Sequence, residues 1–225
     1  MSNSPATGRS PKTLEDPLAY LPHSTVLDYA IGQTIYDQTQ ASTSIYLVIQ
    51  GKVKICRLAA NDNQVVLDIY QTDEFFGEAA LLGSVLLRTE MAIAIERTKV
   101  MTWTTTQIGD VAARRPQLAV ALLQLLVHRS QFFGERIESF SVDNIARRLA
   151  RALLRFSERM GHVTENGPVK MSPLTHELLA QYVGTTRENV THYMNQFRRK
   201  GYLHYSRKGI LVRPDMIRAL LAREK

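Results

Sequence analysis

Polar side chains that could contact nucleic-acid bases recur near residue 190 at the spacing of one helix face. Glu188, Thr191, His192 and Asn195 fall together at about 100° per residue, and Arg187 lies at the edge of this stripe. An arginine can pair with O6 and N7 of guanine, and a glutamate can accept a hydrogen bond from N4 of cytosine. The opposite face is apolar and consists of Val190, Tyr193, Met194 and Phe197. The pattern predicts a helix that packs on one side and reads base edges with the other.

The segment before this helix contains the features of a first helix and a tight turn. Thr175 can cap the first helix, and Gly184 can end it because glycine adopts a positive φ at little cost. We expect the second helix to start at Thr185, where a capping box would bind Glu188 back to the Thr185 N–H. Glu188 therefore has two candidate roles, capping in the free protein and base contact in a complex. The unit is a helix-turn-helix pattern, whose second helix enters the major groove.

Two short apolar runs after this helix predict a β-hairpin with a basic tip. Residues 202–205 and 210–212 are the expected strands, joined by the segment 206–209. The unit is thus a winged helix-turn-helix. Side chains better placed for phosphates, which position a protein without reading sequence, are Arg198, Arg199, Lys200, Arg207 and Lys208. The expected DNA contacts are Thr175, Thr186, Arg187, Glu188, Thr191, His192, Arg199 and Lys208.

Charge is distributed unevenly along the 225 residues, and the excess of basic over acidic side chains lies in the part of the chain that contains this unit. Residues 142–225 hold 16 of the 28 basic side chains but only 7 of the 21 acidic ones, whereas residues 1–141 are slightly acidic. A basic segment beside a near-neutral one is typical of a nucleic-acid-binding domain attached to a domain with another task. A basic surface that only faces solvent is the alternative.

The first half of the chain has the pattern of a β-domain. Apolar and polar residues alternate between Thr34 and Trp103, and glycine or asparagine turns interrupt them. The expected strands are 44–49, 52–58, 64–70, 91–96 and 99–103. Short strands at this spacing indicate a sandwich or roll of jelly-roll character.

After Pro116 the apolar period becomes helical for about 25 residues. Leu118, Leu122, Leu125 and Phe132 form a stripe that we interpret as a coiled-coil-like dimer seam. The alternative is that this stripe packs on the roll of its own chain. A further helix is expected at 145–159. The predicted fold is α+β, with a disordered arm over 1–16, a roll over 17–115, a dimerisation helix over 116–141 and a winged helix-turn-helix over 142–225.

Composition limits the other possibilities. Cys56 is the sole cysteine, so an internal disulfide and a multi-thiolate metal or iron–sulfur site are excluded, and we expect a small buried side chain. No apolar run reaches the roughly 18 residues of a membrane span, and the polar N-terminus does not resemble a signal peptide. We therefore expect a cytoplasmic protein without a membrane partner. A cupin-type metalloenzyme needs several histidines within its strands, yet His23 is the only histidine of the first 110 residues.

Three motifs in this order resemble the Crp/Fnr superfamily of bacterial transcription regulators. They are Gly77-Glu78-Ala79-Ala80-Leu81-Leu82, then Arg88-Thr89, then Val183-Gly184-Thr185-Thr186-Arg187-Glu188-Asn189-Val190, with the long helix between the second and third. The resemblance covers nearly the whole chain, from about residue 16 to residue 212. It implies a roll of the cyclic-nucleotide-binding type, a dimerising helix, and a winged helix-turn-helix that binds a palindrome and contacts RNA polymerase.

The resemblance also implies an effector pocket in the roll. The family's phosphate-binding segment places a glutamate on the ribose hydroxyl and an arginine on the phosphate, which Glu78 and Arg88 match. Gly77 would let the backbone come close to the ligand, and Thr89 follows the arginine. The alternative is that Arg88 pairs with Glu78 or Glu90 and the pocket is vestigial.

Departures from the family pattern bear on the ligand. Phe133 and Gly134 stand where cyclic-AMP-responsive members offer a Thr-Ser pair to the adenine, so Phe133 would contact the effector. His192 stands where those members carry a second arginine that reads a base. The cysteines of the Fnr branch are lacking, and we expect neither an iron–sulfur cluster nor haem, although His23 and His128 are present.

The sequence therefore predicts a homodimeric transcription regulator that is not an enzyme. Its effector is a cyclic nucleotide or another small molecule, and its partners are double-stranded DNA, a second copy of the chain and RNA polymerase. The alternative is a DNA-binding protein that needs no effector and uses its roll only as a scaffold.

Overall fold

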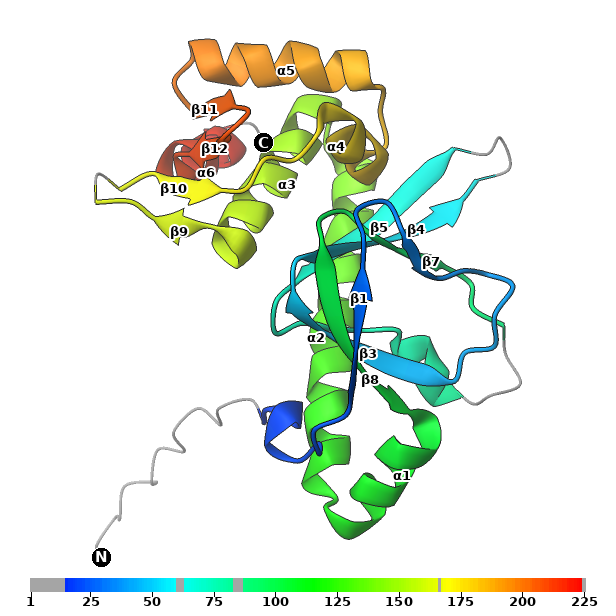
Figure 1. The fold of residues 1–225 in the computed structure, drawn as a ribbon. Coiled ribbons are helices and arrows are strands. Elements are labelled where there is room, and N and C mark those ends of the chain that lie inside the picture. The colour runs from blue at the N-terminus through cyan, green and yellow to red at the C-terminus, as the bar shows by residue number, and fades with distance from the viewer. Residues whose placement is uncertain (1–14, 60–62, 83–86, 166, 224–225) are drawn as a thin grey trace, which may run out of the picture.

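The computed structural model describes residues 15–59, 63–82, 87–165 and 167–223. The disordered arm expected over 1–16 lies outside the described residues except for its last two. Asp16 caps a short 3-10 helix, η1 (Pro17–Ala19), by accepting a hydrogen bond from the Leu18 N–H. Figure 1 shows an N-terminal β-domain, a long central helix and a C-terminal domain built mainly of helices.

Two four-stranded antiparallel sheets form the roll, in the orders β1-β8-β3-β6 and β2-β7-β4-β5. The strands are β1 (Thr25–Tyr29), β2 (Thr34–Tyr36), β3 (Ser44–Gln50), β4 (Lys52–Leu58), β5 (Gln64–Gln71), β6 (Phe75–Phe76), β7 (Met91–Ala94) and β8 (Thr98–Thr104). A short 3-10 helix, η2 (Glu78–Leu82), follows β6. Gly51 joins β3 to β4 at φ +88°, and a Cβ there would lie 2.5 Å from the Arg97 carbonyl oxygen. This turn therefore requires glycine.

Alternating side chains of both sheets fill the space between them. Tyr36, Val53 and Ile55 come from one sheet, and Val48 and Val100 from the other, and all are buried. This is the sandwich arrangement that the alternating sequence pattern predicts.

The outer face of the sheet that contains β3 and β8 packs against two helices. The first, α1 (Thr105–Arg114), was not expected from the sequence and begins with a capping box between Thr104 and Gln107. The second is the central helix α2 (Gln117–Val142). Leu118 and Leu122 of α2 are buried beside Trp103 of β8.

The predicted dimer seam was wrong in its residues. Leu118, Leu122 and Phe132 are 0%, 7% and 9% exposed within one chain, and Leu125 is partly buried against the roll. Leu118, Leu122 and Leu125 cover the apolar outer face of the roll, as the alternative interpretation holds, and Phe132 packs in the cluster that includes Leu149 of the C-terminal domain. A second copy of α2 cannot pack on side chains that the same chain already buries.

The C-terminal domain contains four helices and a four-stranded sheet of order β11-β12-β10-β9. Its elements are α3 (Ile145–Met160), β9 (His162–Val163), β10 (Val169–Met171), α4 (His176–Val183), α5 (Arg187–Arg199), β11 (Leu203–Ser206), β12 (Gly209–Val212) and α6 (Pro214–Arg223). The winged helix-turn-helix is present, whereas β9, β10 and α6 were not expected. Strands of two and three residues are too short for alternation to be visible in a sequence.

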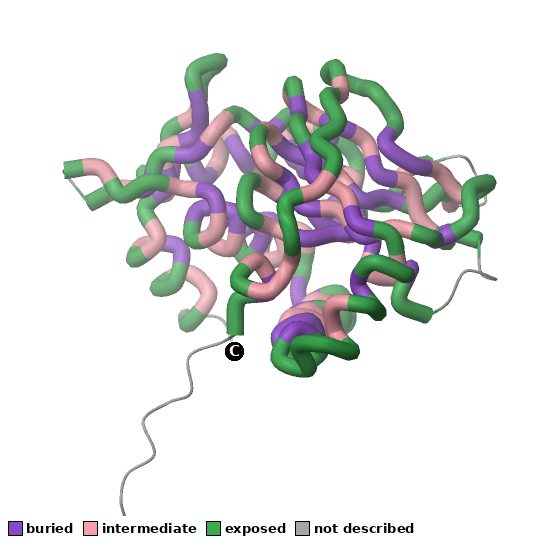
Figure 2. The backbone as a smooth tube through the Cα atoms, turned by 60° about the horizontal axis from the view of Figure 1, so that its bottom comes forward, coloured by how far each residue is buried: buried purple, intermediate pink, exposed green. Residues whose placement is uncertain are grey.

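The roll and the C-terminal domain share one hydrophobic core. Cys56, Val66 and Ile69, on the outer face of the second sheet, join the cluster that contains Leu149 and Leu179. Cys56 is fully buried, as predicted. Figure 2 shows buried positions concentrated through the middle of the molecule and exposed ones around its rim. Within the described residues, no helix is long and apolar enough to cross a membrane.

Candidate functional site

The turn between α4 and α5 forms as its residues predict. Thr175 caps α4, its hydroxyl accepting a hydrogen bond from the Leu178 N–H at 3.1 Å. Gly184 ends α4 in the left-handed conformation at φ +70°. A Cβ at Gly184 would lie 2.9 Å from the ring of Phe140 on α2, so the turn presses directly on the central helix.

The start of α5 differs from the prediction by one residue. Thr186, rather than Thr185, is the N-cap, and its hydroxyl accepts from the Asn189 N–H at 3.3 Å. Glu188 is therefore the second helical residue, and the capping box expected between Glu188 and Thr185 is not formed. Hydrogen bonds from the Glu188 N–H and the Thr186 hydroxyl lower the pKa of the Glu188 carboxyl, which is exposed and ionised at neutral pH.

The polar and apolar faces of α5 lie as the sequence indicates. Val190, Met194 and Phe197 are buried in the domain core. Arg187, Glu188 and His192 are exposed, and Thr191 is half-buried. In Figure 1, α5 lies at the outer edge of the molecule, on the far side of α3 and α4 from the roll. The polar face is open to a partner as large as a DNA duplex.

His176, which the sequence analysis did not single out, holds α4 against α5. Its Nδ1 lies 2.8 Å from the Thr191 hydroxyl, and that hydroxyl donates to the Arg187 carbonyl oxygen at 2.9 Å. Because a hydroxyl has one hydrogen, His176 Nδ1–H must be the donor in this pair. Burial, followed by the charge of Arg187, lowers the pKa of His176, which is consistent with a neutral ring. The Thr191 hydroxyl is thus occupied within the protein.

The basic tip of the hairpin is the two-residue turn Arg207-Lys208, both exposed. The hairpin is tied to α5 by Tyr205, whose hydroxyl donates to Asn195 Oδ1 at 3.0 Å. The Arg198 guanidinium lies 5.3 Å from the centre of the Tyr205 ring. Arg199 is exposed at the last turn of α5. Wing and helix therefore form one rigid basic surface.

In the roll, Gly77 and Arg88 come together as the resemblance implies. Gly77 has φ +80°, and a Cβ there would lie 3.3 Å from Arg88 Nη1. Arg88 is 3% exposed, donates from Nη2 to the Ser44 carbonyl oxygen at 2.9 Å, and lies 3.7 Å from the centre of the Tyr36 ring. Arg88 Nη1 is buried without a hydrogen-bond partner among the described residues. One edge of this guanidinium remains available to an anion.

The two acidic neighbours of Arg88 have other partners. Glu78 forms an ion pair with Arg129 of α2, and Glu90 accepts a hydrogen bond from the Tyr36 hydroxyl at 3.1 Å. Among the described residues Arg88 forms an ion pair with neither glutamate, because Arg129 of the central helix pairs with Glu78 and the Tyr36 hydroxyl binds Glu90. Burial, followed by the charge of Glu78, raises the pKa of Glu90.

Two other residues expected at the effector, Thr89 and Phe133, are exposed. The Thr89 side chain is exposed and accepts a hydrogen bond from Arg57 Nη2 at 3.0 Å. Phe133 is 36% exposed on α2 and does not belong to the core of the roll. Arg88 lies beside a group of aromatic rings, 3.7 Å from the centre of the Tyr36 ring and 5.5 Å from that of Tyr46. The group consists of Tyr36, Tyr46, Tyr70 and Phe76, with neighbouring ring centroids 5.1 to 6.1 Å apart.

Comparisons with known proteins give separate matches for the roll and for the C-terminal domain. Residues 26–115 match the family model "Cyclic nucleotide-binding domain", and residues 147–220 match "Crp-like helix-turn-helix domain". The transcriptional regulator SdrP of Thermus thermophilus is 32% identical over 161 residues, which are 70% of this chain and 73% of that protein. The chain belongs to the Crp/Fnr family of transcription regulators.

Two further relatives span a larger share of this Crp/Fnr protein. A CRP-like cAMP-activated global transcriptional regulator of Mycobacterium tuberculosis is 27% identical over 187 residues, 83% of each chain. The solved structure of a CRP/FNR-family regulator of Thermus thermophilus has a TM-score of 0.71 and 26% identity, and it covers 89% of this chain and 100% of its own. The protein is a DNA-binding transcription regulator, in a family of regulators rather than of enzymes.

Proposed function

We propose that this Crp/Fnr protein binds a palindromic DNA site as a homodimer, with α5 of each copy in the major groove. The observation that carries the proposal is the exposed row at the N-terminal end of α5, formed by Arg187, Glu188 and His192. In a helix-turn-helix this end of the second helix meets the base edges.

Each side chain then has a role that fits its surroundings. Arg187 pairs with guanine, and Glu188, ionised and exposed, accepts from cytosine N4. Thr191 has its hydroxyl bonded within the protein, so its methyl group is what remains for contact with a thymine methyl group. His192 occupies the third reading position. The phosphate contacts are made by the residues that begin α4 and α5, Thr175 and Thr186, and by the basic side chains Arg199 and Lys208.

A second apolar row on α2 is suited to pairing with another copy of the helix. Val120, Leu123, Val127 and Ile137 are 48%, 60%, 49% and 67% exposed. Val120, Leu123 and Val127 are three and four residues apart, the period of a coiled coil, and the same period continues through Ser130 and Gly134 to Ile137. This row supports a parallel pair of α2 helices that presents two recognition helices to two half-sites.

We place the protein in the cytoplasm, where DNA and RNA polymerase are available to it. RNA polymerase is proposed as a further partner because the protein belongs to a family of bacterial transcription regulators.

The roll favours a second candidate function, DNA binding without a cyclic nucleotide. Arg88 and Gly77 keep the arrangement that receives a phosphate, but the group of aromatic rings lies beside Arg88, and Glu78 is bound to Arg129. The roll is then a scaffold that holds α2, or it takes an effector other than cyclic AMP.

Selection from a pool of random duplexes tests both proposals. The full chain should recover a palindrome with half-sites about one helical turn apart, roughly 34 to 36 Å. Selection with cyclic AMP should return the same site at the same enrichment. An asymmetric site would contradict the dimeric arrangement, and enrichment only with cyclic AMP would contradict the effector-independent candidate.

A further inference from the structure

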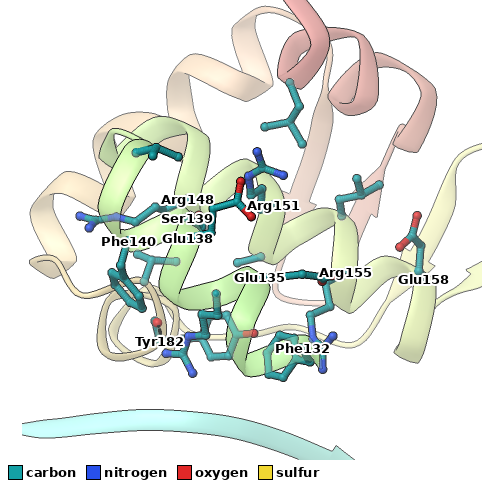
Figure 3. Close-up of a pocket in the computed structure, with 16 residues that line it drawn as sticks. Phe132, Glu135, Glu138, Ser139, Phe140, Arg148, Arg151, Arg155, Glu158 and Tyr182 are labelled. Atoms are coloured by element: carbon teal, nitrogen blue, oxygen red, sulfur yellow. Dashed lines mark hydrogen bonds between the residues drawn. The ribbon is translucent and has the colours of Figure 1, made fainter. Parts of the chain in front are cut away.

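A cavity of about 410 Å³ lies where the last third of α2, one face of α3 and the end of α4 meet. Its volume falls in the range of roughly 300 to 1,000 Å³ that is usual for small-molecule sites. Figure 3 shows its aromatic walls, Phe132 and Phe140 from α2 and Tyr182 from α4. It lies outside the roll, and neither Gly77 nor Arg88 lines it.

Two of the four arginines that line this cavity are held by the protein itself. Arg136 donates to the carbonyl oxygens of Val66 at 2.7 Å, of Tyr182 at 2.6 Å, and of Leu67. Arg151 donates from Nε to Asp143 at 2.6 Å. These two side chains hold the walls of the cavity in place, and these hydrogen-bond donors are already used within the protein.

The other two arginines retain donor groups. Arg148 lies 5.1 Å from the centre of the Phe140 ring, its Nε is buried without a partner, and it forms no ion pair with any described residue. Arg155 lies over Phe132, its Nε is also buried without a partner, and Asp68 is 3.4 Å from its Nη2. Buried guanidinium nitrogens without acceptors cost free energy, and an anion would remove that cost.

The described glutamates that line the cavity do not pair with Arg148, whereas Arg155 has an ion-pair partner in Asp68. Glu135 and Glu138 are exposed on α2, and Glu158 pairs with Arg218 of α6 at 2.6 Å. Within the described part of the chain, none of the three glutamates forms an ion pair with Arg148. The cavity therefore has aromatic walls and, at Arg148, a positive charge without an acidic partner among the described residues.

A dimer partner on the exposed row of α2 would flank this cavity. Ser139, which lines the cavity, lies two residues after Ile137, or about 200° around the helix, whereas Phe140, which also lines it, lies three residues after Ile137 and only about 60° away. A helix that packs on Ile137 therefore approaches the Phe140 side of the cavity and leaves the Ser139 side free.

We propose that this cavity is a binding site for a small organic anion with a flat apolar body, such as an aromatic carboxylate or sulfonate. The anionic group meets Arg148, and the body packs between Phe140 and Phe132. Arg148 and Arg155 are seven residues apart, about 10.5 Å along α3, so a single anionic group engages one of them. Since the walls come from α2, α3 and α4, and Phe140 presses on Gly184, a bound anion also biases the orientation of the recognition helix.

The probe for the test is 1-anilinonaphthalene-8-sulfonate, titrated by fluorescence and calorimetry into the full-length protein. Arg148→Gln should weaken its binding about tenfold or more, because a charge-assisted hydrogen bond is lost, and Arg148→Lys should weaken it less. Arg97→Gln, which removes an exposed arginine on the roll, is the matched control and should bind as the wild type does. The uncharged N-phenyl-1-naphthylamine should bind equally to the wild type and to Arg148→Gln.

Binding that is lost in Arg88→Gln and kept in Arg148→Gln would place the anion in the roll and overturn the proposal. Equal binding by all variants would overturn it as well. Urea unfolding checks that each variant is folded, and Arg148→Met, which should weaken probe binding as Arg148→Gln does, provides a second variant should Arg148→Gln be unstable. Saturating probe should shift the affinity for operator DNA several-fold in the wild type and in Arg97→Gln but not in Arg148→Gln, and an unchanged affinity in the wild type would overturn the link to the recognition helix.

Discussion

Arg187 and Lys208 are both exposed and basic, but one begins a helix and the other lies at the tip of a hairpin. Arg187→Ala should weaken binding to the selected operator by about 1 to 3 kcal/mol and relax the preference at one G·C pair. Lys208→Ala should weaken binding to every sequence to a similar extent, because it removes a phosphate contact. Anisotropy titrations on operator and scrambled duplexes measure both. Equal losses for Arg187→Ala on the two duplexes would contradict its role in base reading.

Asp143 provides a second prediction for a single residue, at the junction of α2 and α3. Burial of its carboxyl opposes ionisation, but hydrogen bonds from Arg147, Ser139 and Arg151 outweigh that effect and lower the pKa of Asp143 to about 2. A folded-state pKa below the unfolded value stabilises the protein above about pH 4, and this contribution is lost as the pH falls through about 2. Asp143→Asn should therefore reduce the free energy of unfolding at pH 7 by about 2 kcal/mol.

Urea unfolding of the wild type and Asp143→Asn between pH 3 and pH 7 measures this difference. It should be constant above about pH 4 and shrink below it. A difference that does not depend on pH would mean that Asp143 stabilises the junction by its shape rather than by its charge. Asp215→Asn, on the exposed first turn of α6, is the control and should show little change.

The central helix shows what apolar periodicity can and cannot predict. Its existence and length follow from the pattern, but α2 has two apolar rows with similar spacing, one buried at Leu118 and Leu122 and one exposed at Leu123 and Val127. Periodicity does not tell which row meets the roll. The outer face of the roll, which includes Trp103, decides this, and that face exists only after β3 and β8 have paired.

Combined replacement of Leu123 and Val127 by Asp should give folded monomers, because two charges then face each other across the proposed seam. Sedimentation velocity measures the association state, and the monomers should bind the palindrome far less tightly than the wild type. Leu82→Asp, on an exposed leucine of the roll, should remain dimeric. Leu122→Asp should unfold instead of dissociating, because it buries a carboxylate in the core. A dimeric Leu123 and Val127 variant would place the seam elsewhere.

Local features of the recognition unit were predictable to within one residue. Thr175 and Gly184 begin and end α4 as expected. Thr185 and Thr186 can both cap a helix, and the predicted cap, Thr185, was wrong because Thr186 caps α5. Contacts between distant segments were not predictable. The pairing of Glu78 with Arg129 depends on α2 crossing the roll, and no local pattern encodes it.

At the scale of the whole molecule, ion pairs fasten α3 to the roll. Arg159 binds Asp68 at 2.8 Å and Glu74 at 2.8 Å, and Asp68 is 3% exposed. Arg159→Ala leaves that carboxylate buried with weaker compensation and should cost about 3 to 5 kcal/mol of stability. Arg218→Ala breaks an exposed pair with Glu158 and should cost at most about 1 kcal/mol. Urea unfolding compares the two, and similar small losses would show that the interface does not depend on Arg159.

The filled interior of the roll predicts the response to cyclic AMP. An adenine inserted between the two sheets of the roll would have to displace packed rings such as Tyr36 and Phe76, which are fully buried. Calorimetry should therefore detect no tight binding of cyclic AMP, with or without operator DNA. Binding in the micromolar range that tightens when DNA is added would contradict this, since coupling between two sites is reciprocal. Arg88→Gln should abolish any such binding if it occurs at the roll.

The core that Cys56, Val66 and Ile69 share with the C-terminal domain limits how this protein can be recombined. A recognition unit cut from the chain before α3 would expose the apolar surface that now faces β5. The C-terminal domain therefore cannot be transferred to another protein by itself. A chimera that takes its C-terminal domain from a relative must also take, or redesign, the face of β5 against which that domain packs.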